Sequence, residues 1–194
     1  MTKIIGLTGG IGSGKTTIAN FYQSLGIPVY IADDEARKIT ELPETISKIR
    51  QEFGNSIFDN EKLNREKLAQ LVFNDADQLR KLNAIVHPAV AKHFKDWLGQ
   101  HFHEPIVIKE AAILFESGSY KDCDAVITVT APLETRIERI LKRDKTTRSD
   151  ILKRIENQWP DAKKIANSDY VIDNADIKQA KLQAGEILKK LIIR

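Results

Sequence analysis

The sequence predicts an α/β fold, with helices on both faces of a mostly parallel sheet. Three observations support this prediction: short apolar runs of strand length recur along the chain, segments with helical spacing separate them, and a glycine-rich loop follows the first run. The chain has 194 residues, 42% hydrophobic and 29% charged, which excludes collagen-like, low-complexity and wholly disordered proteins.

The N-terminal elements are expected to be a strand, a loop, a helix and a second strand. Residues 4–7 are predicted to form a short buried strand, and residues 16–22 carry apolar side chains at helical spacing. A second strand over residues 29–31 ends at the acidic pair Asp33 and Asp34. We therefore expect a carboxylate at the end of a strand.

The middle of the chain, residues 34–103, is predicted to be a helical insertion without a convincing strand. Its apolar residues recur at helical spacing in separate segments. These are residues 44–53, 65–73, 77–85 and 88–98.

Strands and helices alternate again in the last part of the chain. Strands are expected over residues 106–108, 125–129 and 170–172. The second of these leads through Pro132 into a helix rich in Arg and Lys, and a helix over about residues 177–192 closes the chain. Strands separated by helices indicate a parallel sheet with right-handed crossovers.

Charge and cysteine content limit the setting and the partners. The chain has 30 Lys and Arg against 27 Asp and Glu, a formal net charge of +3, so its overall charge gives no reason to expect nucleic acid as a partner. No apolar run is long enough for a membrane span, and no secretion signal is visible. Cys123 is the single cysteine, which excludes an intrachain disulfide. We expect a cytoplasmic protein with no obligate protein partner.

The glycine-rich loop, residues 9–16, fits the pattern G-x-x-x-x-G-K-[ST] between a predicted strand and a predicted helix. Its glycines let backbone N–H groups turn toward phosphate oxygens, and the positive end of the following helix points at the same group. Lys15 adds a full charge, and Thr16 offers a hydroxyl to Mg²⁺. The dinucleotide pattern G-x-G-x-x-G is absent, because Lys15 stands where its last glycine would be. The sequence therefore predicts a nucleotide phosphate site.

Two carboxylates at predicted strand ends are candidates for chemistry beside this loop. Asp33 could accept the proton of an acceptor hydroxyl, or it could cap the following helix, and the local sequence favours neither. Glu110 could hold Mg²⁺ through water, or it could be an exposed carboxylate.

Arginines at spacings of three and four residues form the last candidate group. Arg136, Arg139 and Arg143 are expected on neighbouring turns of one helix face. In a phosphoryl-transfer enzyme such arginines neutralise charge on the transferred group and can belong to a mobile lid. Without the phosphate loop, a solvated helix face would be the better interpretation.

Taken together, the motifs resemble those of the dephospho-CoA kinase family over nearly the whole chain. The set is far more specific than the phosphate loop, which many nucleotide-binding families share. Its members are Leu7 to Thr17, Ala32-Asp33-x-x-Ala36-Arg37, Arg65-x-x-Leu68-x-x-x-Val72-Phe73, His87-Pro88, Leu114-Phe115-Glu116, Arg139-x-x-x-Arg143-Asp144 and Asn157-Gln158.

The resemblance implies ATP-dependent phosphorylation of the ribose 3′-hydroxyl of dephospho-CoA, with Mg²⁺, as the last step of CoA biosynthesis. It implies a P-loop NTPase-like three-layer α/β/α fold in three parts. These are a nucleotide-binding core of residues 1–33 and 104–194, a helical substrate-binding insertion of residues 34–103, and a lid within about residues 136–165.

The resemblance also suggests roles by position. Asp33 resembles the family's proposed base, and Arg65 and His87 resemble positions in the substrate region. With the residues above, this gives Asp33, Lys15, Arg139 and Arg143 as catalytic candidates and Thr16 and Glu110 as metal candidates. The candidates for nucleotide binding are Gly12, Ser13, Gly14, Lys15, Thr16, Thr17 and Asn174.

The chain departs from the family's common pattern at four positions. Ile31 replaces the first carboxylate of a common Asp-Ala-Asp, so Asp33 must act without that neighbour. Ala112 stands where proline is common, Glu110 where aspartate is common, and Arg136 where glutamine is common. The expected consequences concern metal geometry and lid contacts.

Two other functions fit the phosphate loop alone. One is a different phosphate-loop kinase, acting on a nucleoside, a nucleotide or another metabolite. The other is a nucleotide-dependent binding switch, although the guanine-specific string Asn-Lys-x-Asp is absent. An acceptor screen separates these possibilities.

Overall fold

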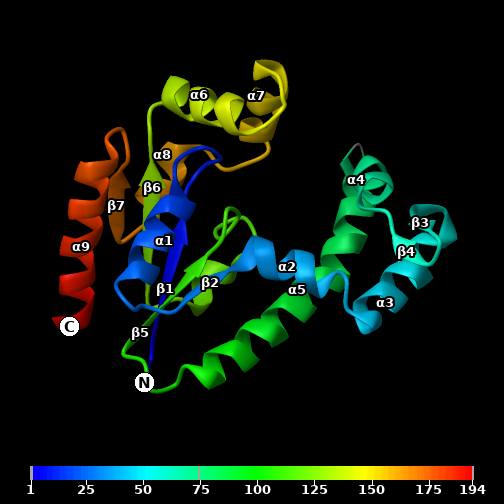
Figure 1. Ribbon diagram of the computed structural model, residues 1–194, viewed down its shortest axis with the longest axis horizontal. Coiled ribbons are helices and arrows are strands. Elements are labelled where there is room, and N and C mark those ends of the chain that lie inside the picture. The colour runs from blue at the N-terminus through cyan, green and yellow to red at the C-terminus, as the bar shows by residue number, and fades with distance from the viewer. Residues whose placement is uncertain (1, 74, 194) are drawn as a thin grey trace. The chain divides into compact units, whose positions relative to one another are not determined.

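A computed structural model describes residues 2–73 and 75–193 of the chain (Figure 1). The chain divides into two compact units. The first comprises the residues up to Ile31 and those from His101 onward, and the second comprises Ala32–Gln100.

The first unit is built on a five-stranded sheet with the order β2-β5-β1-β6-β7, in which every pair is parallel. β1 is the central strand. The chain passes to one side of it for β2 and β5 and to the other side for β6 and β7, and open α/β sheets bind ligands beyond the carboxyl ends of the strands at such a reversal. The strands are β1 (Lys3–Thr8), β2 (Val29–Ile31), β5 (Ile106–Glu110), β6 (Ala125–Thr130) and β7 (Tyr170–Asp173).

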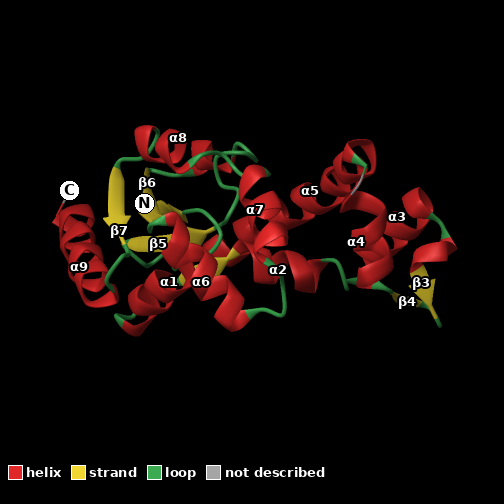
Figure 2. Cartoon of the chain, turned by 90° about the horizontal axis from the view of Figure 1, so that it is seen from above, coloured by secondary structure: helices red, strands yellow, loops and turns green. Residues whose placement is uncertain are grey.

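Side chains of β1 alternate between two covered faces. Ile5 and Leu7 are fully buried in a core cluster with residues of α1 and α9. Gly6 faces the other way, where an added Cβ would meet Leu114 and Cys123. Helices therefore lie on both faces of the sheet (Figure 2), and the predicted three-layer α/β/α fold is confirmed.

The helices predicted over residues 16–22, after Pro132 and over about residues 177–192 are all present in the first unit, which also contains helices that the sequence did not predict. In the described ranges, 2–73 and 75–193, no helix combines the length and the apolar character that a membrane span requires. The helices of this unit are α1 (Lys15–Ser24), η2 (Ser119–Asp122), α6 (Leu133–Arg143), α7 (Arg148–Glu156), α8 (Asp161–Ala166) and α9 (Ile177–Ile193).

The second unit is mainly helical and has a core of its own around Ile49, Ile57 and Leu68. Its longest helix contacts the other three α-helices of the unit. The elements are α2 (Ala32–Ile39), α3 (Pro43–Phe53), η1 (Asn55–Ile57), β3 (Phe58–Asp59), β4 (Lys62–Leu63), α4 (Arg65–Phe73) and α5 (Ala76–Gln100).

The expectation that residues 34–103 contain no strand is wrong in one detail. β3 and β4 form a short antiparallel hairpin, turned by Asn60 and Glu61, which both have positive φ. Two residues per strand are too few to show the alternation that identifies a strand in sequence.

The expectation of separate helices over residues 77–85 and 88–98 is also wrong, because both segments belong to α5. Pro88 lies inside this helix and removes the backbone donor that would bond to the carbonyl of Ala84. The helix continues nonetheless because α5 packs along α2, α3 and α4. Tertiary packing outweighs the local effect of the proline.

Candidate active site

The glycine-rich loop joins the end of β1 to the start of α1. Gly14 is the N-cap residue and has the left-handed conformation, with φ of 90°. Among the described residues, no side chain caps this helix, and the N–H of Thr17 donates to the carbonyl of Gly14. The N–H groups of Lys15 and Thr16 in the first turn are therefore available to an anion. The loop has the backbone of a phosphate site.

At Gly14 and Gly9 of the loop, a side chain would collide with neighbouring residues. An added Cβ at Gly14 would lie 2.1 Å from Nδ2 of Asn174, and one at Gly9 would lie 2.2 Å from the carbonyl oxygen of Val129. Both glycines also have positive φ, which disfavours L side chains. The close contacts show that β6 and β7 support the loop from behind.

Lys15 and Glu110 form a buried ion pair beside the loop. Nζ of Lys15 lies 3.5 Å from Oε1 of Glu110, and the two side chains are 12% and 3% exposed. Glu110 arrives here because β5 pairs with β1, with Glu110 opposite Leu7. The interpretation of Glu110 as an exposed carboxylate is therefore wrong. The pairing fixes the position of the Lys15 ammonium and places carboxylate oxygens beside the loop. Thr16, the next residue, is exposed in the first turn of α1.

Asn174 and Arg139 hold the second half of the loop. Nδ2 of Asn174 donates a hydrogen bond of 2.8 Å to the carbonyl of Ser13. The Arg139 guanidinium donates to the carbonyls of Ser13 (3.4 Å) and Asn174 (2.8 Å). Asn174 is buried against the loop and holds the carbonyl of Ser13.

Arg143 lies in a different environment from Arg139. Its guanidinium donates two hydrogen bonds to the carboxylate of Asp144, and its side chain is 65% exposed. These hydrogen bonds raise the pKa of Arg143 and lower the pKa of Asp144. Arg136, Arg139 and Arg143 do not share one solvated face, since Arg136 is buried, Arg139 half-buried and Arg143 exposed.

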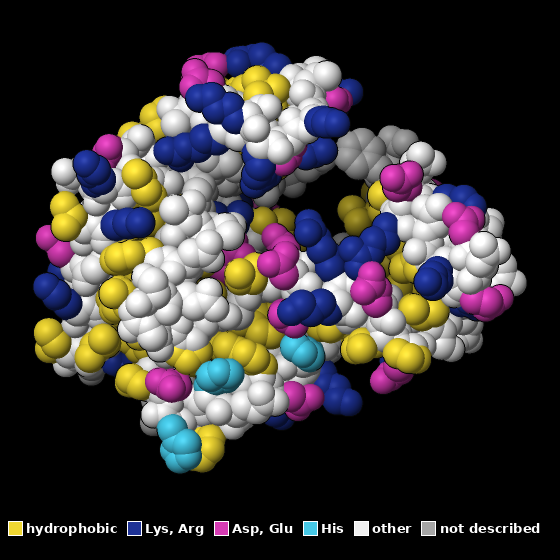
Figure 3. All heavy atoms as spheres, in the orientation of Figure 1, with side chains coloured by type: hydrophobic (Ala, Val, Ile, Leu, Met, Phe, Trp, Pro, Cys, Tyr) yellow, Lys and Arg dark blue, Asp and Glu magenta, His cyan; other side chains and the backbone are white. Residues whose placement is uncertain are grey.

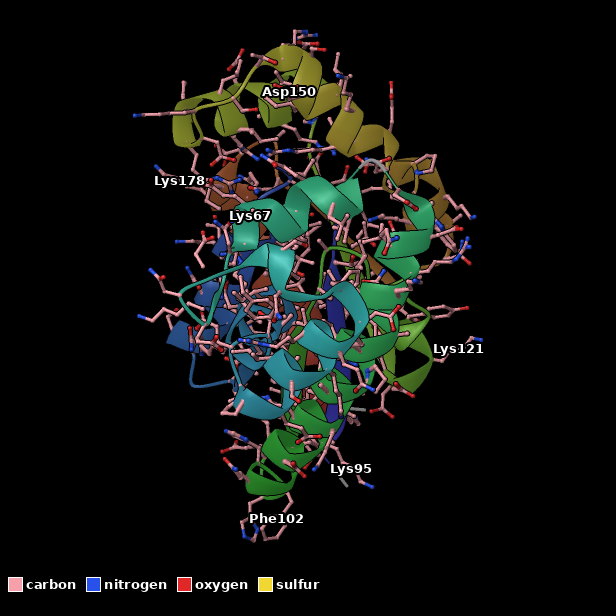
Figure 4. The ribbon with its side chains drawn as sticks, turned by 90° about the vertical axis from the view of Figure 1, so that its right-hand side faces the viewer. Lys67, Lys95, Phe102, Lys121, Asp150 and Lys178 are labelled. Carbon is pink, nitrogen blue, oxygen red and sulfur yellow. The ribbon has the colours of Figure 1, made fainter. Side chains whose placement is uncertain are left out.

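The helices α6 and α7 form a pair that contacts the loop. Ile137, Ile140 and Ile151 form a buried cluster, and Ile11 of the loop packs against it. Lys and Arg side chains are frequent on the outer surface of this pair (Figure 3). Thr147 is the N-cap residue of α7, and its hydroxyl accepts a hydrogen bond from the backbone N–H of Asp150, which is labelled in Figure 4.

Three candidate residues, Asp33, Arg65 and His87, lie in the helical unit. The prediction that Asp33 ends a strand is wrong: β2 stops at Ile31, and Asp33 lies in the first turn of α2, where the helix dipole stabilises a carboxylate. Arg65 donates to the carbonyl of Arg37 (2.9 Å) and pairs with a carboxylate of the same segment, so it is tied to the helix that carries Asp33. His87 is exposed on α5.

The segment around α8 contains residues whose contacts the sequence did not reveal. Lys164 is fully buried, and its Nζ lies 3.0 Å from both the carbonyl of Ala112 and Oε1 of Glu116. The backbone N–H of Trp159 donates to the same carboxylate. From the sequence, a lysine in a short charged helix is expected at the surface. Lys164 is buried because α8 packs against the sheet.

The fold and the loop together define a P-loop nucleotide-binding protein of the α/β/α class. Residues 3–179 match the family model for dephospho-CoA kinase, and the chain belongs to this family. The resemblance drawn from the motifs is thereby confirmed.

Curated relatives carry the same family name, and a solved structure has a similar fold. A dephospho-CoA kinase of Bacteroides fragilis is 37% identical over 171 residues, covering 88% of this chain and 83% of its own. One of Chlorobium luteolum is 38% identical over 199 residues, covering 97% and 90%. A crystal structure from Thermus thermophilus is 32% identical, with a TM-score of 0.91 and 97% of each chain covered.

Proposed function

We propose that this chain transfers the γ-phosphoryl group of ATP to the ribose 3′-hydroxyl of dephospho-CoA, giving CoA and ADP as the last step of CoA biosynthesis. The observation that carries the proposal is the phosphate loop with its buried Lys15–Glu110 pair, in a chain of which residues 3–179 match the dephospho-CoA kinase family. A kinase needs such a loop to hold its phosphoryl donor.

The nucleotide side of the reaction belongs to the loop and α1. Residues 12–17 bind the phosphates, chiefly through the N–H groups of Gly12, Gly14, Lys15 and Thr16, because those of Ser13 and Thr17 donate to the carbonyls of Gly10 and Gly14. Lys15 neutralises charge on the β and γ groups. Asn174 and Arg139 support this site by holding the carbonyl of Ser13, and Arg139 lies close enough to the loop to act on the transferred group as well. Arg143 is proposed to turn from Asp144 to the phosphoryl group when the substrates bind.

The acceptor side is assigned to the helical unit. Asp33 accepts the proton of the 3′-hydroxyl, the hydroxyl oxygen bonds to the γ-phosphorus, and the bond from that phosphorus to its bridging oxygen breaks, releasing ADP. Arg65 and His87 bind dephospho-CoA. The exposure of Asp33 and His87 supports these roles, because both side chains are accessible to a ligand.

The residues at the loop fit a magnesium ion. Mg²⁺ prefers hard oxygen ligands and usually keeps waters and substrate phosphates in its coordination sphere. Thr16 offers a hydroxyl in the exposed first turn of α1, and Glu110 offers a carboxylate beside the loop, so these two residues would hold the ion with the phosphates of ATP. When bound, Mg²⁺ neutralises charge on the phosphates.

We assign residues 1–33 and 104–194 to nucleotide binding, residues 34–103 to substrate binding, and a lid to about residues 136–165. The compact unit Ala32–Gln100 supports the second assignment, and the α6–α7 pair packed on Ile11 supports the third. The proposed reaction involves two small-molecule substrates, ATP and dephospho-CoA, and no protein or nucleic-acid partner takes part in it. We place it in the cytoplasm, where a free thiol such as Cys123 stays reduced.

The test is product detection by mass spectrometry after incubation with Mg·ATP and dephospho-CoA. We expect CoA to form, no phosphorylation of adenosine or pantetheine, and loss of product in Lys15→Ala. Lys178→Ala is the matched control, because Lys178 is an exposed lysine of α9 (Figure 4). ATP binding without CoA formation would refute the proposed acceptor and leave the nucleotide site in place.

A further inference from the structure

Arg136 is a buried arginine that holds the first half of the phosphate loop. Its side chain is 4% exposed, and its Nε donates a hydrogen bond of 2.8 Å to the carbonyl of Ile11. Its NH1 lies 2.7 Å from a carboxylate oxygen of Asp161, the first residue of α8. One guanidinium thus connects α6, α8 and the loop.

The loop lies in close contact with this arginine on two sides of Ile11. An added Cβ at Gly10 would lie 2.3 Å from NH2 of Arg136, and one at Gly12 would lie 2.7 Å from its carbonyl oxygen. NH2 itself is buried and has no hydrogen-bond partner among the described residues. The position of the guanidinium is therefore determined by its contact with the loop as well as by its ion pair.

A second side chain, that of Gln158, also bonds to the loop at Ile11. Oε1 of Gln158 accepts a hydrogen bond of 2.9 Å from the N–H of Ile11. Both backbone polar groups of Ile11 are thus bonded by side chains, its N–H by Gln158 and its carbonyl by Arg136. Two fixed hydrogen bonds on one residue determine the orientation of the peptide groups on either side of it.

The ion pair with Asp161 makes this arrangement rigid. Hydrogen bonds to ionised groups are shorter and stronger than neutral ones, and a buried charge that loses its partner is strongly unfavourable. Asp161 is 26% exposed and Arg136 is 4% exposed, so Arg136 is the more deeply buried member of the ion pair. The favourable position for the guanidinium is therefore between Asp161 and the loop.

We propose that Arg136, held by Asp161, is a positioning residue that fixes residues 10–12 of the loop in the conformation that binds the nucleotide phosphates. It touches the loop and not the reacting atoms. The proposal rests on the proposed function in one respect, that the loop binds ATP. Arg139 and Asn174 hold Ser13, so the loop is fixed at two separate points.

The experiment compares Arg136→Met, Arg136→Lys, Asp161→Asn and the double variant Arg136→Met/Asp161→Asn in the full-length protein. Equilibrium Kd values for ATP and ADP are measured with the KM values of both substrates. We expect Arg136→Met to raise both nucleotide Kd values about 10-fold to 100-fold, the range of one charged hydrogen bond. The KM for dephospho-CoA should stay within about 2-fold, and Arg136→Lys should recover part of the loss.

The thermodynamic cycle tests whether the two residues act together. If Asp161 affects ATP binding only by holding Arg136, the Kd of the double variant for ATP should be about equal to the higher of the two single-variant Kd values. Full additivity of the two effects would refute this coupling. Lys178→Met is the control, because Lys178 is an exposed cationic residue of α9, outside the loop and the proposed lid. Its nucleotide Kd should be unchanged.

A purely structural role for Arg136 predicts a different result. In that case a folded Arg136→Met protein would show a lower unfolding temperature with an unchanged nucleotide Kd, which would refute the proposal. If Arg136→Met does not fold, Asp161→Asn decides the question, since a raised Kd supports positioning and an unchanged Kd overturns it. Because binding is measured without the acceptor, this outcome is independent of whether dephospho-CoA is the substrate.

Discussion

At the scale of single residues, burial determines which charged groups can do chemistry. The Lys15–Glu110 pair is almost fully buried, whereas Asp33 lies exposed in the first turn of α2. A buried pair has a fixed direction, and an exposed carboxylate is free to meet a ligand. This division is the one expected if the loop binds the phosphoryl donor and Asp33 has the proposed role of base.

The proposed role of Asp33 as the base leads to a prediction with a neighbouring control. Asp33→Asn should lower kcat by about 10²-fold to 10⁴-fold, the usual range for a lost general base. Asp34→Asn, a substitution of the next residue in the same helical turn, should change kcat little. Initial rates of CoA formation at saturating substrates measure both. Normal turnover of Asp33→Asn would show that another group accepts the proton.

At the scale of elements, α8 is joined to the sheet by buried charge in addition to apolar packing. The fully buried Lys164 bonds to Ala112 and Glu116 in the segment after β5, and the same carboxylate accepts from Trp159 before the helix. The rings of Phe115 and Trp159 stack at a centroid distance of 5.7 Å. The segment after β5 and the segment before α8 are thus fixed together.

We predict that Lys164→Met destabilises the protein by about 3–5 kcal/mol, because the Glu116 carboxylate loses the cation that pairs with it. Lys164→Met/Glu116→Gln should recover most of this loss, since the neutral amide can still accept from the N–H of Trp159. Urea unfolding at constant m-value measures the difference in free energy of unfolding.

The control for this prediction is Lys121→Met, a substitution of an exposed lysine in the same unit (Figure 4). Surface changes of this kind usually stay within about 0.5 kcal/mol. A loss below about 1 kcal/mol in Lys164→Met would show that the charge pair is not what holds α8.

At the scale of the whole molecule, two compact units with separate cores are linked by the chain at Ile31 and at His101. The phosphate loop, the Lys15–Glu110 pair and their supports belong to the first unit. Nucleotide binding should therefore stabilise that unit directly, because the folded loop binds ATP and the unfolded chain does not.

We predict that ATP at about 100 times its Kd stabilises the protein by about 2.7 kcal/mol, a rise in unfolding temperature of roughly 5–10 °C for a chain of this size. Thermal unfolding followed by circular dichroism measures the shift. Lys15→Met/Glu110→Gln should abolish it while avoiding the unpaired Glu110 carboxylate that Lys15→Met alone would leave. An undiminished shift in the double variant would contradict the assignment of Lys15 to the phosphates.

Features that depend on residues close together in the chain could be predicted before the structure was known. The apolar runs predicted every strand of the main sheet, and the spacing of Gly9, Gly14 and Lys15 predicted the phosphate loop. These predictions were possible because the residues that form each strand, the loop and the helix after it lie close together in the chain.

The tertiary structure alone decided which side chains are buried and what they contact. Pro88 suggested a helix boundary, but packing carries α5 through it. From the sequence, Arg136 and Lys164 would be expected at the surface. In the structure, Arg136 is buried against the loop, and Lys164 of α8 is buried against the segment that follows β5. Their partners lie 25 or more residues away in the chain, and burial of a charge depends on contacts that no local pattern records.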